Sequence, residues 1–136
     1  MISVAARNES NEAGPLLSID SLLKKLVAQV EGATGAIILE ADGEAVRWYA
    51  VVDSDRLRLR GAYVAVVLKA CRATASSAER GDTRSLLLKY DRSCLVVREI
   101  DRDCFVVLEL GPSANIGQAL FRLEPIVTDL RGEIAA

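Results

Sequence analysis

The sequence has no histidine among its 136 residues. Histidine is the commonest general base near neutral pH and the commonest metal ligand, so its absence removes the simplest route to acid–base catalysis or a transition-metal site. The phosphate-binding patterns G-x-x-x-x-G-K-[ST] and G-x-G-x-x-G are missing, as is the nucleophile pattern G-x-S-x-G. We therefore expect a protein that is not an enzyme and that holds no cofactor and no metal ion.

An excess of positive charge and long apolar runs are also missing. The formal net charge is −2, whereas a nucleic-acid-binding protein needs a concentrated basic face to neutralise phosphates. No apolar run approaches the roughly 20 residues that cross a bilayer, and Asn8, Glu9, Asn11 and Glu12 interrupt the N-terminal region, unlike a signal peptide. We expect a cytoplasmic protein with no nucleic-acid partner and no membrane insertion.

Cysteine is scarce, with three residues and no C-x-x-C pair. Cys94 and Cys104 fall on neighbouring predicted strands, opposite about Glu109 and Glu99 respectively, which separates the two sulfurs too far for a disulfide. We interpret them as small buried hydrophobic residues. Acidic residues gather in predicted turns, as at Asp42 with its neighbour Glu44, where carboxylates usually cap the backbone or face solvent.

What the chain does contain is enough apolar sequence for one domain, at 51% hydrophobic and 26% charged residues. Residues 1–17 are interpreted as a mobile leader and residues 18–136 as a single domain. The expected elements begin with a helix from Ser18 or Asp20 to Gly32, a strand at 36–39, a hairpin turn at Asp42-Gly43 and a strand at 45–51. Asp53-Ser54-Asp55 is expected to cap a helix at 55–80. Strands at 85–90, 93–100 and 104–110 follow, and then a helix from Asn115 that kinks or ends near Leu123 because of Pro125. This order predicts an α+β fold, α-β-β-α-β-β-β-α, with a five-stranded antiparallel sheet and helices on both faces.

The central helix is unusually apolar. Its apolar or small residues cover an arc of roughly 240°, whereas packing on one surface needs only about 100°. One flank holds Leu57, Val64, Leu68 and Ala75, the middle holds Val67, Cys71, Thr74 and Ala78, and the other flank holds Leu59, Val66, Ala70 and Ala73. The remaining stripe holds Arg58, Gly61, Ala65, Lys69, Arg72, Ser76 and Glu79. A domain of this size offers one sheet face to the helix, so the second packing surface indicates a sister subunit.

The sequence resembles the roadblock / dynein light chain family over residues 18–132. The resemblance rests on Leu22-Leu23-x-x-Leu26-Val27-x-x-Val30-x-Gly32-Ala33-x-Gly35-Ala36, on the Asp42-Gly43 hairpin, on the central helix, and on Leu110-Gly111-Pro112-Ser113-Ala114-Asn115-Ile116-Gly117 before the last helix. The chain departs from the pattern at Pro125 and in lacking a clear glycine beyond Gly81 before the strand that ends near Asp91. The resemblance implies a roadblock-like, profilin-like sandwich that pairs through the central helix and the strand after it.

The resemblance further implies a non-catalytic homodimer that binds and regulates a Ras-like small GTPase. Two alternatives stay open: a scaffold or motor-complex light chain without effect on GTP hydrolysis, and a small-molecule sensor of PAS-like or profilin-like fold. The expected dimer interface consists of Leu59, Tyr63, Val66, Val67, Ala70, Cys71, Thr74, Leu86 and Leu88. The expected partner-binding stripe consists of Arg58, Gly61, Ala65, Lys69 and Arg72.

Overall fold

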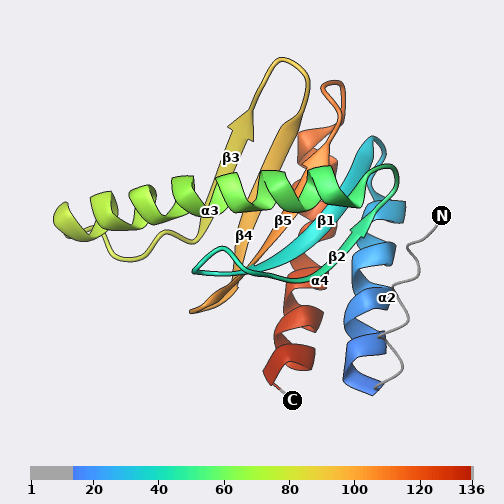
Figure 1. Cartoon of the computed structure of the whole chain (residues 1–136), viewed down its shortest axis with the longest axis horizontal. Helices are drawn as coiled ribbons and strands as arrows, with labels where there is room; N and C mark the ends of the chain where they lie inside the picture. Colours follow the sequence, from blue (N-terminus) through green and yellow to red (C-terminus); the bar gives the residue numbers. More distant parts are fainter. Residues whose placement is uncertain (1–13, 136) are drawn as a thin grey trace.

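A computed structural model describes residues 14–135 of the chain. The elements in chain order are α2 (Gly14–Gln29), β1 (Ala33–Glu40), β2 (Ala45–Ala50), α3 (Ser54–Ser77), β3 (Ser85–Lys89), β4 (Cys94–Asp101), β5 (Cys104–Leu110) and α4 (Ile116–Ala135). Figure 1 shows one sheet with helices on both sides. The expected α+β class and the order of helices and strands are confirmed.

The five strands form one antiparallel sheet in the order β2-β1-β5-β4-β3. The central strand β5 is buried along its whole length. The β1–β2 turn depends on Gly43, which adopts φ +98° and donates its N–H to the carbonyl of Glu40 at 2.8 Å. Glycine is the residue that takes such a φ without steric cost. The two edges of the sheet are β2 and β3.

Two hydrophobic clusters lie on opposite faces of this sheet. Helices α2 and α4 cover one face, where Leu23, Leu26 and Leu123 are fully buried. Helix α3 crosses the other face over β1 and β2, and its C-terminal part extends past the β3 edge (Figure 1). On that face Phe105 is the largest buried side chain. The molecule therefore has three layers, and α3 is the most exposed of them.

The first helix begins earlier than the sequence predicts. It starts at Gly14, not at Ser18 or Asp20, so the last residues assigned to the leader belong to α2. Pro15 suits the first turn of a helix, because its fixed φ is helical and its missing N–H would have no partner there. Residues 1–13, the rest of the expected leader, lie outside the described residues.

The last helix does not end near Leu123, which is one of the two outcomes, a kink or an end, that the sequence predicts for Pro125. It continues from Ile116 to Ala135 with Pro125 inside it. Leu123, Ile126 and Leu130 on both sides of the proline are buried against the sheet and α2. Burial of these side chains outweighs the one hydrogen bond that the proline removes, since tertiary packing supplies most of the stability of protein helices.

Both ends of α3 are capped. Asp53 accepts the N–H groups of Asp55 and Arg56 at 3.1 and 3.2 Å, as the sequence predicts. At the other end the helix stops at Ser77, three residues before the expected end. Glu79 then adopts φ 56°, and the N–H of Arg80 reaches back to the carbonyl of Ala75 at 2.9 Å. This is a Schellman ending with a glutamate where glycine is usual.

Candidate protein-interaction surface

The face of α3 that meets the sheet differs from the face that the sequence predicts. Leu57, Val64 and Leu68 are buried, as expected, but Gly61 and Ala65 are buried with them. A Cβ atom at Gly61 would lie 3.1 Å from a methyl carbon of Leu39, so the helix lies close to the sheet at this glycine. The prediction that Gly61 and Ala65 belong to a solvent-facing partner stripe is wrong, because small residues here let the helix lie close to β1.

The outward face of α3 is apolar and exposed. Leu59 is 53% exposed, Tyr63 64% and Val66 68%. Ala62, Ala70 and Ala73 continue this stripe toward the C-terminal end and are exposed too. Contiguous apolar surface of this kind on a soluble domain marks an interaction site more often than chance exposure. We use the name outer stripe for six exposed apolar residues of α3, namely Leu59, Ala62, Tyr63, Val66, Ala70 and Ala73.

One flank of α3 is intermediate in burial. Val67 and Cys71 are half-buried, while Thr74 on the same flank is exposed. Leu86 and Leu88 of the edge strand β3 point to the same side of the sheet as α3 and are half-buried against its cluster. Together these residues form a side face, partly apolar, next to an open sheet edge. An open edge strand with apolar side chains is a template for pairing with another chain.

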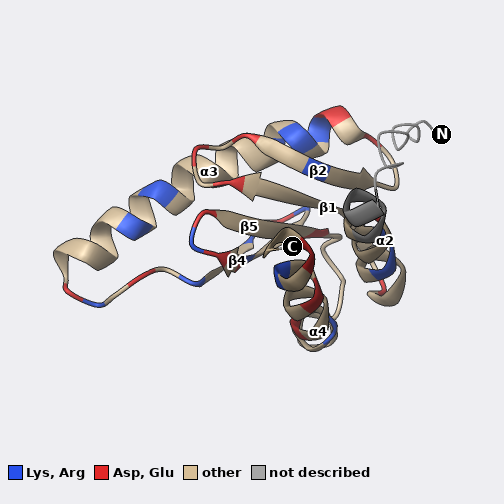
Figure 2. Ribbon diagram, turned by 90° about the horizontal axis from the view of Figure 1, so that it is seen from below, with Lys and Arg blue, Asp and Glu red and all other residues tan. Residues whose placement is uncertain are grey.

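The basic residues of the expected partner stripe have separate surroundings. The guanidinium of Arg58 lies 4.5 Å from the ring centre of Trp48, and Lys69 is exposed. Arg72 lies over the ring of Phe105 at 5.3 Å and donates to the carbonyl of Arg102 at 3.2 Å. Basic residues lie along α3, with acidic residues near its first turn (Figure 2). Arg58 also pairs with the exposed Asp55 at 3.6 Å, a surface contact that a partner's carboxylate could replace. Arg58 and Lys69 thus border the outer stripe, whereas Arg72 serves the packing of α3 on the sheet.

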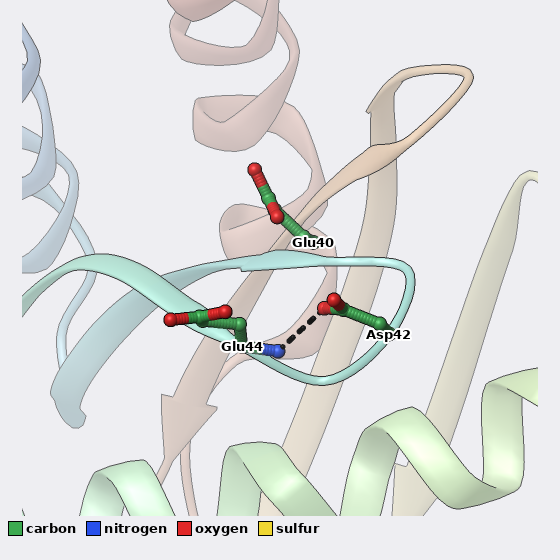
Figure 3. Close-up of side chains that lie close together, drawn as sticks. All are labelled: Glu40, Asp42 and Glu44. Atoms are coloured by element: carbon green, nitrogen blue, oxygen red, sulfur yellow. Dashed lines mark hydrogen bonds between the residues drawn. The ribbon is translucent and has the colours of Figure 1, made fainter.

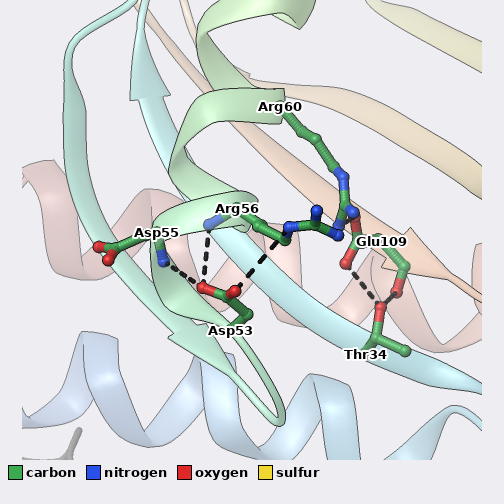
Figure 4. A network of polar contacts seen from close by, with 6 residues as sticks. All are labelled: Thr34, Asp53, Asp55, Arg56, Arg60 and Glu109. Atoms are coloured by element: carbon green, nitrogen blue, oxygen red, sulfur yellow. Dashed lines mark hydrogen bonds and ion pairs between the residues drawn. The ribbon is translucent and has the colours of Figure 1, made fainter.

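A polar network lies under the first turns of α3 (Figure 4). Glu109 of β5 is 6% exposed, and its carboxylate accepts from the Arg60 guanidinium at 2.5 Å and from the Thr34 hydroxyl at 2.8 Å. Neither residue of this ion pair is among the site residues expected from the sequence. A signal was available, because Glu109 is the one charged residue within the otherwise apolar run Cys104–Leu110.

The acidic residues between β1 and β2 belong to an exposed turn. Glu40, Asp42 and Glu44 are all exposed, with one oxygen of each within 4.8 Å of the others. Asp42 accepts the N–H of Glu44 at 3.0 Å, so its carboxylate stabilises the turn (Figure 3). This is the capping role that the sequence predicts for turn carboxylates.

The cysteines are free thiols, as expected. The strand register places Cys94 opposite Leu110 and Cys104 opposite Asp101, one and two residues from the expected positions. Burial raises the pKa of the Cys104 thiol to about 11, helped by the carboxylates of Asp101, Glu40 and Asp103. Burial likewise raises the pKa of Cys94. Neither is poised as a nucleophile, since the thiolate is the reactive form.

In the part of the chain that the structure describes, no helix is both long and apolar enough to cross a membrane.

Comparison with known proteins gives a family and a fold. The family model named "Roadblock/LC7 domain" matches residues 19–109. A Roadblock/LC7 domain from Streptomyces avermitilis is 20% identical, with a TM-score of 0.78 over 86% of this chain and 98% of its own. The gliding protein MglB from Thermus thermophilus is 17% identical, with a TM-score of 0.80 over 89% and 91%. Profilin IB from Acanthamoeba castellanii is 19% identical, with a TM-score of 0.56 over 84% and 97%. No curated protein in the sequence comparison matches the chain.

Proposed function

Because the chain belongs to the Roadblock/LC7 domain family, we propose that it is a non-catalytic homodimer that binds and regulates a Ras-like small GTPase. The observation that carries the proposal is the outer stripe of α3, where Leu59, Tyr63 and Val66 are each more than half exposed. A solvated helix face would carry polar residues there. The apolar stripe, with the open β3 edge beside it, supports an assembly role.

The two subunits would pair through the side face and the β3 edge. Pairing of β3 with its copy would join two sheets and bring the half-buried Val67 and Cys71 against the partner helix. Leu86 and Leu88 would then lie under the part of the partner's α3 that extends past its own sheet (Figure 1). This arrangement would remove an exposed edge strand from solvent.

The GTPase would dock on the outer stripe, which stays exposed in such a dimer because it faces away from the sheet. Leu59, Val66 and Ala70 would form the apolar centre, and Arg58 and Lys69 would meet acidic residues at its rim. An apolar centre with a charged rim is the usual composition of a protein interface. The two copies of the stripe would form one ridge, so that one GTPase would bind across two subunits.

The test is a pull-down with the intact chain, followed by single-turnover GTP hydrolysis by any small GTPase recovered. We expect the wild-type chain to change the rate of GTP hydrolysis and the Val66→Asp variant to leave this rate unchanged. The matched control is Val52→Asp, which changes a valine that is 84% exposed in the β2–α3 connection, away from the outer stripe. The isolated chain should neither bind nor hydrolyse GTP, since no phosphate-binding pattern occurs in its sequence.

Each outcome has a consequence. A GTPase that binds while its hydrolysis rate is unchanged would favour a scaffold or light-chain role over regulation. Failure to recover a small GTPase, or equal binding by Val66→Asp and wild type, would contradict the docking proposal.

A further inference from the structure

Helix α4 carries two locally unfavourable features one turn apart, on the face of the sheet opposite α3. Phe121 is 73% exposed, the largest exposure of any aromatic side chain described. Pro125 lies inside the helix. Because proline has no backbone N–H, the carbonyl of Phe121, four residues earlier, lacks its usual helical hydrogen-bond donor. Sequences tend to break local rules of this kind at functional positions. Neither feature takes part in the surface proposed for the GTPase.

These residues border a groove between α2 and α4. The groove has a volume of about 370 Å³ and is lined by Lys25, Gln29, Phe121, Arg122, Glu124, Pro125, Ile126 and Asp129. Ile126 at its base is 1% exposed, whereas Phe121 and Pro125 are exposed. One surface thus presents both a projecting ring and a hollow able to receive one.

The charges around the groove have both signs. Glu124 is already paired with Arg98 of β4. Within the described residues, Lys25, Arg122 and Asp129 have no ion-pair partner. Arg122 and Asp129 are seven residues apart, about two helical turns, so they cannot pair with each other within one helix. Arg122 and Asp129 lie on either side of Pro125, so a second copy of this surface, turned about a two-fold axis there, would offer each of them a side chain of opposite charge.

We propose that this groove is a self-association site, in which α4 of a second copy packs antiparallel about a two-fold axis near Pro125. Each Phe121 enters the hollow of the other copy, between the proline and the aspartate that line it. The antiparallel arrangement brings Arg122 opposite the other copy's Asp129, twice by symmetry. A contact that uses the same patch on both copies is the isologous kind.

This site is separate from the α3 face, because α3 and α4 lie on opposite sides of the sheet (Figure 1). Pairing through both surfaces would build an assembly larger than a dimer. Helix α4 offers two large exposed apolar side chains, Leu120 and Phe121, so we expect its contact to form only at higher protein concentration. The inference does not rest on the proposed GTPase function, and a variant that disables the α3 pairing separates the two contacts.

The experiment is sedimentation velocity over a concentration series from about 1 μM to about 1 mM, the range in which small interfaces associate. Each α3-paired dimer carries two α4 surfaces, so wild type should pass from dimer to tetramer and then to larger species, whereas Phe121→Ser should stay dimeric over the whole range. The control is Val52→Ser, which removes an exposed valine far from α4 and should behave as wild type. In a chain that also carries Val67→Asp, which disables the α3 pairing, the same α4 contact should convert monomer into dimer.

Charge reversal tests the symmetry directly. Arg122→Asp alone should weaken the association by about tenfold or more, because it places two carboxylates opposite each other. Arg122→Asp combined with Asp129→Arg should restore it to within a few-fold of wild type. A wild-type chain that gains no association through α4 at any concentration would overturn the proposal. So would a double variant that associates no better than Arg122→Asp alone.

Discussion

Arg60 on α3 donates to the buried carboxylate of Glu109 on β5 across 2.5 Å, and the pair joins the helix to the centre of the sheet. Thr34 of β1 donates to the other carboxylate oxygen at 2.8 Å. The network therefore fixes the first turns of α3 relative to two strands. This position matters for function, because the same helix carries the outer stripe.

Arg60→Ala should destabilise the fold, because it leaves the buried Glu109 carboxylate without a cation. Removing one partner of a buried pair is costly, but the Arg60 side chain is 42% exposed, so we expect a loss of about 2 kcal/mol rather than the full range for buried pairs. Adding Glu109→Gln to this variant should recover most of the loss, since a neutral amide can still accept from Thr34. Urea unfolding of the single and double variants measures both values. No difference between them would show that the ion pair is not the cause.

Glu79→Gly should stabilise the protein, because Glu79 holds φ 56° at the end of α3. A residue with a Cβ is strained there, and glycine is not, although glycine also gains entropy in the unfolded chain. The net gain should be about 0.5–1 kcal/mol in the free energy of unfolding, visible as a rise of a few degrees in Tm. Glu79→Ala, which removes the carboxylate but keeps the Cβ, is the control and should not give this gain.

The sequence predicts this fold well because the residues that form its turns and helix caps act on their near neighbours. Asp42-Gly43 and Asp53 act within a few residues of themselves, and the structure uses each of them as expected. The errors concern long-range packing. A helical wheel places Gly61 on the solvent-facing side, yet in the structure its small size lets α3 lie close to β1. Pro125 reads as a helix end, yet the buried side chains around it keep the helix intact.

The interaction surfaces are harder to predict, because helical periodicity cannot show where the sheet lies. The apolar arc of the central helix does exceed one packing face, but its orientation is rotated from the expected one. The sequence places Val66 in the dimer interface. In the single chain Val66 faces away from the sheet and is 68% exposed, and its place in the interface stays a prediction. Nothing in the sequence singles out Phe121, and only its exposure beside a groove marks it.

In the Val67→Asp variant, where the α3 pairing is disabled and no second copy covers Cys71, alkylation at pH 8 should modify Cys71 well before Cys104 and Cys94. Burial and nearby carboxylates raise the pKa of Cys104 to about 11, so roughly one molecule in a thousand carries the thiolate at that pH. Cys71 is half-buried at the side face and accessible in the single chain. Mass spectrometry after iodoacetamide treatment, with and without denaturant, gives the order. Rapid modification of Cys104 in the native protein would contradict its burial.

Asp20→Asn should change how stability depends on pH. Burial raises the pKa of the Asp20 carboxyl above 3.8, and the charges of Arg47, 3.6 Å away, and Lys24 offset this only in part. The folded state then holds the proton more tightly than the unfolded state, so this group loses stability as pH rises through that window. Relative to wild type, the variant should gain stability as pH rises from below 3.8 toward neutral. Asp91→Asn, at an exposed turn, should follow wild type in thermal unfolding across the same range.

Val67→Asp should convert the proposed homodimer into a monomer. Val67 is half-buried on the side face, one helical turn from the half-buried Cys71. An aspartate in the paired helices would place two unpaired carboxylates near the two-fold axis, at a cost of several kcal/mol to association. In the single chain the same side chain can reach solvent, so the fold should persist by circular dichroism. Light scattering at micromolar concentration measures the mass, with Val52→Asp as the control that should remain a dimer. A wild-type chain that is monomeric under these conditions would refute pairing through α3 and β3, and the apolar side face would then need a different partner to cover it.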